Sequence, residues 1–305
     1  MAEKLLALKI DVDTWRGTRE GVPRLLDLLQ RYEAKATFLF SLGPDHTGRA
    51  IRRVFRKGFL QKVSRTSVVE HYGLRTLMYG TLLPGPDIGR REGSLMRSVR
   101  DASHEVGVHC WDHIRWQDYV AGQSPSWTQR EMQRAATRFK EIFGVPALTH
   151  GAAGWQMNLA AYAFERELGF DYASDVRGTH PFQPVDEDGA VLGVPQLPTT
   201  LPTLDELIGL DGLSAENVGQ YLLERTAGQA TSHVYTLHAE LEGMRLADTF
   251  EGLLSGWRQQ GYRLTTCRDL FDSLDATALP KHHVIMGELP GRSGVLALQG
   301  PCADQ

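Results

Sequence analysis

Short apolar runs alternate along the chain with longer segments in which apolar residues recur every three or four positions. The short runs predict β-strands at residues 5–10, 36–40, 105–109, 147–150, 170–174, 234–238 and 262–265. The longer segments predict helices at 19–32, 128–143, 158–168, 215–226 and 246–260. Strands that alternate with helices favour an α/β fold with a largely parallel sheet.

Two segments interrupt this alternation. Turn-forming sequences at Gly43-Pro44 and Pro84-Gly85-Pro86 indicate a large insertion at about residues 45–98. Residues 276–305 are rich in glycine and proline, and we expect a weakly ordered tail there. The remaining alternation predicts one domain at residues 1–275.

Composition narrows the class of protein. The chain has 305 residues, 42% of them hydrophobic, which is enough for a sizeable core. The net charge of -4 provides no excess of Lys and Arg to neutralise phosphates, so we do not expect nucleic-acid binding. Three widely spaced cysteines form no CxxC motif, and no apolar run approaches the roughly 20 residues of a membrane span. With no signal peptide recognisable, we expect a cytoplasmic protein that does not span the membrane.

Ionisable residues gather where the predicted strands end. Asp11 and Asp13 end the first strand, and later strands end at or just before His109, His150, Asp175 and His238. In a barrel of parallel strands these ends meet on one face, where active sites form. We therefore expect one site built from several strands.

The spacing of two of these histidines indicates a catalytic metal site. His109 and His113 form an HxxxH motif, and with Asp13 they would hold a divalent ion while leaving positions open. Asp11 points to the same side of its strand as Asp13 and could take a proton from water. Each motif alone has a simpler explanation: an exposed turn for HxxxH, a helix cap at Asp13, and a core histidine at His238.

Taken in order, these motifs resemble those of the polysaccharide deacetylases, the NodB-homology family. The resemblance implies a deformed (β/α) barrel that removes acyl groups from amino sugars with one divalent metal ion, most simply zinc, with manganese or cobalt as alternatives. It implies Asp11 as general base and His238 as general acid. It also implies that Asp175 orients His238 and that Leu237 lines the acyl pocket.

Longer segments resemble one group within this family more closely. They include KIDVDTWRGTREGVPRLL, EVGVHCWDHIRWQ, HGAAGW and YTLHAELEG. The resemblance implies removal of formyl from an undecaprenyl-phosphate-linked formamido-arabinose, in the lipid A modification associated with polymyxin resistance. Trp155, Arg16 and Arg177 are candidate substrate contacts. The family's usual third motif carries an arginine that holds the base, and HGAAGW has none, so Arg16 or Arg177 could hold Asp11.

A lipid substrate calls for contact with a membrane. Residues 49–62, RAIRRVFRKGFLQK, combine six basic residues with apolar residues at helical spacing. This pattern predicts docking on the cytoplasmic side of the bacterial inner membrane, and residues 72–83 are a second, apolar candidate. The alternative is a solvated helix that packs its apolar side on the barrel.

Three other functions fit parts of the pattern. A deacetylase of another N-acyl amino sugar would share the chemistry, although such enzymes usually work outside the cytoplasm. A non-haem iron oxygenase also uses two histidines and a carboxylate, but usually on a β-sandwich. A non-catalytic barrel that binds lipid or sugar would need neither Asp11 nor His238.

Overall fold

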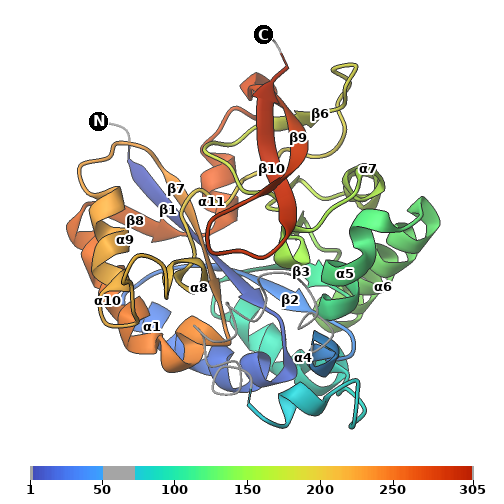
Figure 1. Cartoon of the computed structure of the whole chain (residues 1–305), viewed down its shortest axis with the longest axis horizontal. Coiled ribbons are helices and arrows are strands. Elements are labelled where there is room, and N and C mark those ends of the chain that lie inside the picture. The colour runs from blue at the N-terminus through green and yellow to red at the C-terminus, as the bar shows by residue number, and fades with distance from the viewer. Residues whose placement is uncertain (1–2, 51–72, 304–305) are drawn as a thin grey trace.

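A sheet of seven parallel strands forms the centre of the protein (Figure 1), in a computed structural model that describes residues 3–50 and 73–303. The central strand, β1 (Lys4–Val12), pairs with three others: β2 (Thr37–Ser41), β7 (His233–His238) and β8 (Tyr262–Thr265). Beyond β2 the sheet continues through β3 (Glu105–Cys110), β4 (Thr149–His150) and β5 (Tyr172–Ala173). The strands form a half-barrel, and the predicted α/β fold with a largely parallel sheet is confirmed.

Amphipathic helices surround this sheet and bury their apolar sides against it. The longer ones are α1 (Val22–Arg31), α4 (Ile88–Asp101), α6 (Pro125–Phe143), α7 (Leu159–Leu168), α9 (Val218–Thr226) and α10 (Ala247–Gln259). Shorter helices are α5 (His113–Tyr119), α8 (Leu204–Leu207) and α11 (Cys267–Asp272). No helix in the described ranges is both long and apolar enough to cross a membrane.

Alternation along β1 separates the core from the site. Leu8, Ile10 and Val12 belong to the main hydrophobic core, and all three are inaccessible to solvent. Lys9 and Asp11 point to the opposite side because successive side chains of a strand alternate, and both are also buried. A strand buried on both faces is typical of a parallel sheet, but here one of those faces is polar.

The predicted insertion is only partly described. Residues 51–72, which hold most of the basic segment 49–62, lie outside the described residues. At the other end of the predicted insertion, α4 packs on α6 and β3, with Met96 and Val99 fully buried.

The predicted weak order of residues 276–305 is wrong for the part that is described. Here β9 (Lys281–Glu288) and β10 (Val295–Cys302) form an antiparallel hairpin, and β9 pairs in parallel with β6 (Gln183–Val185). The glycines that indicated disorder instead make the turn: Gly291 and Gly294 both have φ of +81°. The backbone of Arg177 anchors β10 by hydrogen bonds with Ala297 and Gln299.

Candidate active site

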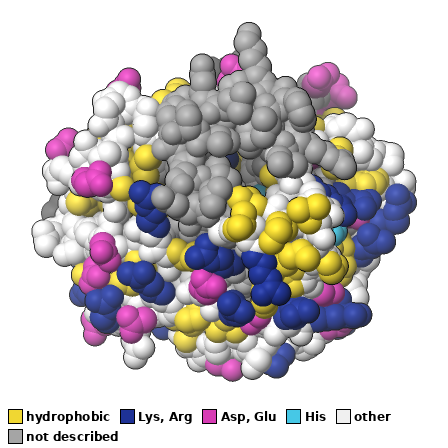
Figure 2. Space-filling model, turned by 60° about the horizontal axis from the view of Figure 1, so that its bottom comes forward, with side chains coloured by type: hydrophobic (Ala, Val, Ile, Leu, Met, Phe, Trp, Pro, Cys, Tyr) yellow, Lys and Arg dark blue, Asp and Glu magenta, His cyan; other side chains and the backbone are white. Residues whose placement is uncertain are grey.

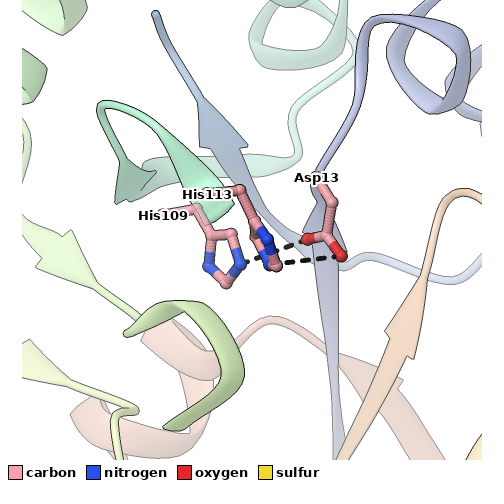
Figure 3. A group of neighbouring side chains, drawn as sticks. All are labelled: Asp13, His109 and His113. Atoms are coloured by element: carbon pink, nitrogen blue, oxygen red, sulfur yellow. Dashed lines mark ion pairs between the residues drawn. The ribbon is translucent and has the colours of Figure 1, made fainter. Parts of the chain in front are cut away.

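The three predicted metal ligands lie together at the end of β1 and β3 (Figure 3). His109 Nε2 is 3.2 Å from Asp13 Oδ1, and His113 Nε2 is 3.4 Å from Asp13 Oδ2. His109 is the second-last residue of β3, whereas His113 is the first residue of α5, which Asp112 caps by accepting a hydrogen bond from the Arg115 amide. The strand end and the capped helix thus turn both imidazoles toward one carboxylate.

The chemistry of these donors fits a cation. His109 Nδ1 donates a hydrogen bond of 2.6 Å to the Gly151 carbonyl, so Nε2 of the neutral ring carries a lone pair. That lone pair faces Asp13 Oδ1, a buried oxygen that accepts no hydrogen bond from the described residues. Two ligand atoms that each lie 2.0–2.1 Å from a tetrahedral metal ion are roughly 3.3 Å from each other. The distances from Asp13 to His109 and to His113 match this separation. A divalent ion would satisfy all three ligands at once.

Asp11 lies opposite His238 on the neighbouring strand β7. The two residues are paired in the β1–β7 register, so their side chains share the polar side of the sheet. Asp11 is 2% exposed, and its Oδ1 accepts no hydrogen bond within the described ranges. The Lys9 ammonium lies 3.5 Å from Asp11 Oδ2 and also donates a hydrogen bond to the Ser174 carbonyl. Asp11 is therefore held by Lys9 on one side, and its other oxygen is left for a reactant.

The charges around His238 favour its protonated form. Burial alone would lower the pKa of this imidazole, but Asp205, Asp13 and Asp11 outweigh burial and raise the pKa above 6.5. The His238 amide donates to Glu242, while its ring Nδ1 is buried and has no hydrogen-bond partner among the described residues. The neighbouring carboxylates therefore favour the protonated ring, and the ring has a nitrogen available to a substrate.

Comparison with known proteins decides the family. A profile of the polysaccharide deacetylases matches residues 1–173, which hold the whole set of Asp11, Asp13, His109 and His113. The chain belongs to the polysaccharide deacetylase family.

Two curated members are similar over nearly the whole chain. One, from Shewanella sediminis (strain HAW-EB3), is 37% identical over 96% of this chain and 94% of its own length. The other, from Wigglesworthia glossinidia brevipalpis, is 31% identical over 93% of this chain and 98% of its own length. Both carry the name probable 4-deoxy-4-formamido-L-arabinose-phosphoundecaprenol deformylase, ArnD.

Solved structures share the fold at low sequence identity. A crystal structure from Mycobacterium smegmatis, assigned to the polysaccharide deacetylases, has a TM-score of 0.61 at 16% identity and covers 94% of this chain and 96% of that chain. The allantoinase PuuE has a TM-score of 0.62 at 14% identity, covering 90% of this chain and 91% of that chain. These similarities establish the fold alone.

The base is held differently from the usual deacetylase pattern. Arg16 pairs with Glu20, and Arg177 pairs with Glu206. Lys9 takes the place of the missing arginine, two residues before the base on the same strand. The guanidinium of Arg177 is engaged by Glu206 and by two backbone carbonyls, so Lys9 rather than Arg177 pairs with Asp11.

Asp175 has a different partner from the one expected. Its Oδ1 lies 2.8 Å from His150 Nδ1, and that nitrogen is also 2.9 Å from Glu165. Asp175 further accepts a hydrogen bond of 2.7 Å from the Ala152 amide. The expectation that Asp175 orients His238 is thus replaced by a buried His150–Glu165–Asp175 cluster, which fixes the loop after β4. The carboxylate that contributes most to the charge around His238 is Asp205.

Leu237 does not line the pocket. It is opposite Ile10 in the β1–β7 register, so it points into the hydrophobic core with Ile10 rather than to the side of Asp11. The expectation for Leu237 is wrong because side chains alternate along the strand, and His238 already occupies the polar side.

Trp155 lies at the edge of the polar side and is 1% exposed. Its φ of 53° is left-handed, a conformation that costs a non-glycine residue about 1–3 kcal/mol. Its ring faces the Lys9 ammonium at 5.2 Å, and its Nε1 donates to Thr199. Trp155 therefore stays a candidate substrate contact, as does Arg16, whose side chain is 29% exposed.

Several residues of the site gave no signal in the sequence. Glu240 follows β7 and accepts hydrogen bonds from the Asp13 and Thr14 amides, which fixes the turn that carries Asp13. Burial and the charge of Asp13 raise the pKa of Glu240 well above 4.5. Lys9 appears in the sequence as one polar position in a buried strand, and only the β1 alternation, which places it on the side of Asp11, could have indicated it.

Proposed function

We propose that this protein hydrolyses the formamide of 4-deoxy-4-formamido-L-arabinose-phosphoundecaprenol, giving formate and the free amino sugar lipid. The observation that carries the proposal is the pairing of Asp11 with His238 across two strands, next to the cluster of Asp13, His109 and His113. The names of the two curated relatives supply the substrate.

Hydrolysis of an amide needs a polarised carbonyl, a base and an acid. A divalent ion bound by Asp13, His109 and His113 would polarise the formyl carbonyl and lower the pKa of a water molecule. Two imidazoles and a carboxylate suit zinc most simply, and manganese or cobalt would also fit.

Asp11 and His238 divide the proton transfers. Asp11 accepts a proton from the attacking water through its unbonded Oδ1, and the water oxygen adds to the formyl carbon. His238 then donates a proton to the sugar nitrogen as the carbon–nitrogen bond breaks, so that the amine leaves neutral. Lys9 keeps Asp11 in place during both steps.

A substrate with a polyprenyl chain requires contact with the cytoplasmic side of the inner membrane. Residues 49 and 50 are the only described part of the basic segment 49–62. In the second candidate, residues 72–83, Leu74 is 68% exposed and Leu82 is 80% exposed. This segment lies at the bottom of Figure 1, and Figure 2 shows hydrophobic side chains bordered by Lys and Arg on the same side of the molecule. The protein would act there as a peripheral enzyme in lipid A modification, which underlies polymyxin resistance.

Membrane contact has a direct test. The double variant Leu74→Glu, Leu82→Glu should sediment less with anionic liposomes than the unchanged protein does. Leu159→Glu is a matched control, because Leu159 is 67% exposed on α7, away from this segment. Equal sedimentation of both variants would show that residues 74 and 82 do not contact the membrane.

The preference for a formyl over an acetyl group is tested by comparing two substrates. Purified protein is incubated with the formamido-arabinose lipid and with its acetamido counterpart, and released formate and acetate are measured. The proposal predicts release of formate with little acetate. Faster release of acetate would favour the alternative, a deacetylase of another N-acyl amino sugar.

A further inference from the structure

The turn of the C-terminal hairpin places an arginine in the active site. Arg292 lies between β9 and β10, and its side chain is only 11% exposed. Its guanidinium carbon is 4.3 Å from the centre of the Trp155 ring, and its Nε donates a hydrogen bond of 2.9 Å to Glu206 on α8. The negative charges near it include Asp205, Glu206 and the catalytic Asp11.

The neighbouring glycine fixes this placement. A Cβ on Gly291 would lie 2.0 Å from the Glu206 carbonyl oxygen, so only glycine lets the turn approach α8 this closely. On the other side of the turn, Gln156 donates a hydrogen bond of 2.6 Å to the Val295 carbonyl. The hairpin is therefore attached both to α8 and to the loop that carries Trp155.

One nitrogen of this guanidinium lacks a partner. Arg292 Nη2 is buried and makes no hydrogen bond to any described residue. Buried donors are almost always satisfied, so an orphan here indicates a ligand that is absent. Asp11 Oδ1, Asp13 Oδ1 and His238 Nδ1 are orphans of the same kind, and all belong to the active site.

Arg292 differs in this respect from the two other cations around Trp155. All three nitrogens of the Arg177 guanidinium are engaged, by Glu206 and by the carbonyls of Thr199 and Leu201. Lys9 is engaged by Asp11 and by the Ser174 carbonyl. Of these three cations, Arg292 alone has a side-chain nitrogen without a hydrogen-bond partner among the described residues.

We propose that Arg292 binds the phosphodiester of the lipid-linked substrate, an inference that rests on the proposed function. A guanidinium is planar and presents paired N–H donors that match two oxygens of a phosphate. The formamide and the phosphodiester are attached to the same small sugar ring. A ligand whose amide lies at Asp11 and His238 therefore carries its phosphate to a neighbouring part of the site, where Arg292 lies.

Binding can be measured without turnover. Geranyl methyl phosphate, a soluble prenyl phosphodiester, is titrated calorimetrically into the metal-loaded protein, with geraniol and inorganic phosphate as separate arms. Arg292→Ala should weaken binding of the phosphodiester roughly 10- to 100-fold, the effect of losing a hydrogen bond to a charged group. Arg292→Lys, which keeps the charge, should lose less. Lys281→Ala, an exposed residue of the same hairpin, should bind like the unchanged protein.

Each other outcome overturns the inference. If the unchanged protein does not bind the phosphodiester, or if Arg292→Ala binds it equally well, Arg292 is not its receptor. If inorganic phosphate binds as tightly as the diester and with the same dependence on Arg292, the site is a general anion site instead. Thermal melting of each variant shows whether the hairpin is still folded.

Turnover separates this inference from the proposed function. Arg292→Ala should lower kcat/KM roughly 10- to 100-fold on the phosphodiester substrate and less than about 3-fold on the methyl glycoside of formamido-arabinose, which has no phosphate. An equal loss on both would assign Arg292 to the amide chemistry. If the unchanged protein released no formate from either compound, the proposed function would fail, while the binding titration would still report on Arg292.

Discussion

At the scale of single residues, the site depends on how one strand places two opposite charges. Lys9 and Asp11 are two positions apart on β1, so both point to the polar side, where the ammonium and carboxylate lie 3.5 Å apart. Both are fully or almost fully buried, and a buried charge without a partner is strongly destabilising. The ion pair with Lys9 therefore holds the Asp11 carboxylate in place as a base.

Replacing Lys9 with methionine tests this positioning role. Lys9→Met keeps the length of the side chain and removes its charge, and misplacement of the base should lower kcat roughly 10- to 100-fold. Metal content, measured by elemental analysis, should not change, because Lys9 is not a ligand. Lys4→Met is the control: Lys4 is on the same strand, but its ammonium donates to the carbonyls of Gln229 and Gln260. Unchanged turnover in Lys9→Met would show that Asp11 needs no cation.

His238 gives a prediction about pH. As a general acid it must be protonated, and the neighbouring carboxylates raise its pKa above 6.5, so the loss of activity caused by its deprotonation should lie on the alkaline side of that raised pKa. Asp205→Asn removes the largest contribution to the rise and should therefore move the alkaline limb of the kcat profile to lower pH. His238→Ala should lower kcat by roughly 10²–10⁴-fold at pH values below that pKa, where the unchanged enzyme has its protonated acid. If the alkaline limb did not move in Asp205→Asn, Asp205 would not be what raises the pKa of His238.

At the scale of elements, features that depend on a local sequence pattern could be predicted, such as where a strand ends. Contacts between elements far apart in the chain could not. The ends of β1 and β3 could be predicted directly from the sequence, and they bring Asp13, His109 and His113 to one place. The orientation of Leu237 could also have been predicted. Successive side chains of a strand point to opposite sides, so Leu237 points away from the side on which His238 lies. No local pattern joins Arg292 to Trp155, because that contact depends on how a distant hairpin packs on the loop after β4.

The packing of the hairpin turn against α8 can be tested by substituting two glycines that have the same φ. Gly291→Ala and Gly294→Ala both place an alanine at φ of +81°, which costs roughly 1–2 kcal/mol. A Cβ at residue 291 also collides with α8, whereas one at residue 294 meets no atom within 4 Å. Gly291→Ala should therefore lose roughly 1–3 kcal/mol more in chemical denaturation than Gly294→Ala. Equal losses would mean that the turn does not pack on α8.

The buried His150 cluster predicts how stability depends on pH. Burial alone would lower the pKa of His150, but Asp175 and Glu165 outweigh burial and raise it to about 9. Because the folded pKa lies above the unfolded value, this stabilisation is complete below about pH 6.5 and is lost as the pH rises toward 9. The free energy of unfolding, measured in urea, should decrease over this range.

Removing the imidazole tests the origin of that decrease. His150→Phe leaves two buried carboxylates without a cation and should cost roughly 3–5 kcal/mol at pH 6.5. It should also remove the part of the decrease that His150 contributes, whereas Glu165, whose pKa burial raises well above 4.5, keeps its own contribution. His180→Phe, at an exposed histidine, should change neither quantity. A decrease that persists in His150→Phe would have to come from other groups.

At the scale of the whole molecule, the half-barrel provides one polar side on an otherwise apolar sheet. An allantoinase with a TM-score of 0.62 has the same architecture, so the fold alone does not choose a reaction. What distinguishes this chain is the set of side chains at the strand ends, together with Arg292 from the hairpin. The central claim is that Asp13, His109 and His113 hold an ion needed for deformylation.

Formate release before and after removal of metal tests this claim most directly. The purified enzyme is assayed on the formamido-arabinose lipid, then treated with a chelator, dialysed, and titrated with zinc, manganese or cobalt. The claim predicts that chelation abolishes formate release, that one equivalent of metal restores it, and that Asp13→Asn is not restored by the same amount. Full activity in metal-free enzyme, confirmed by elemental analysis, would contradict it.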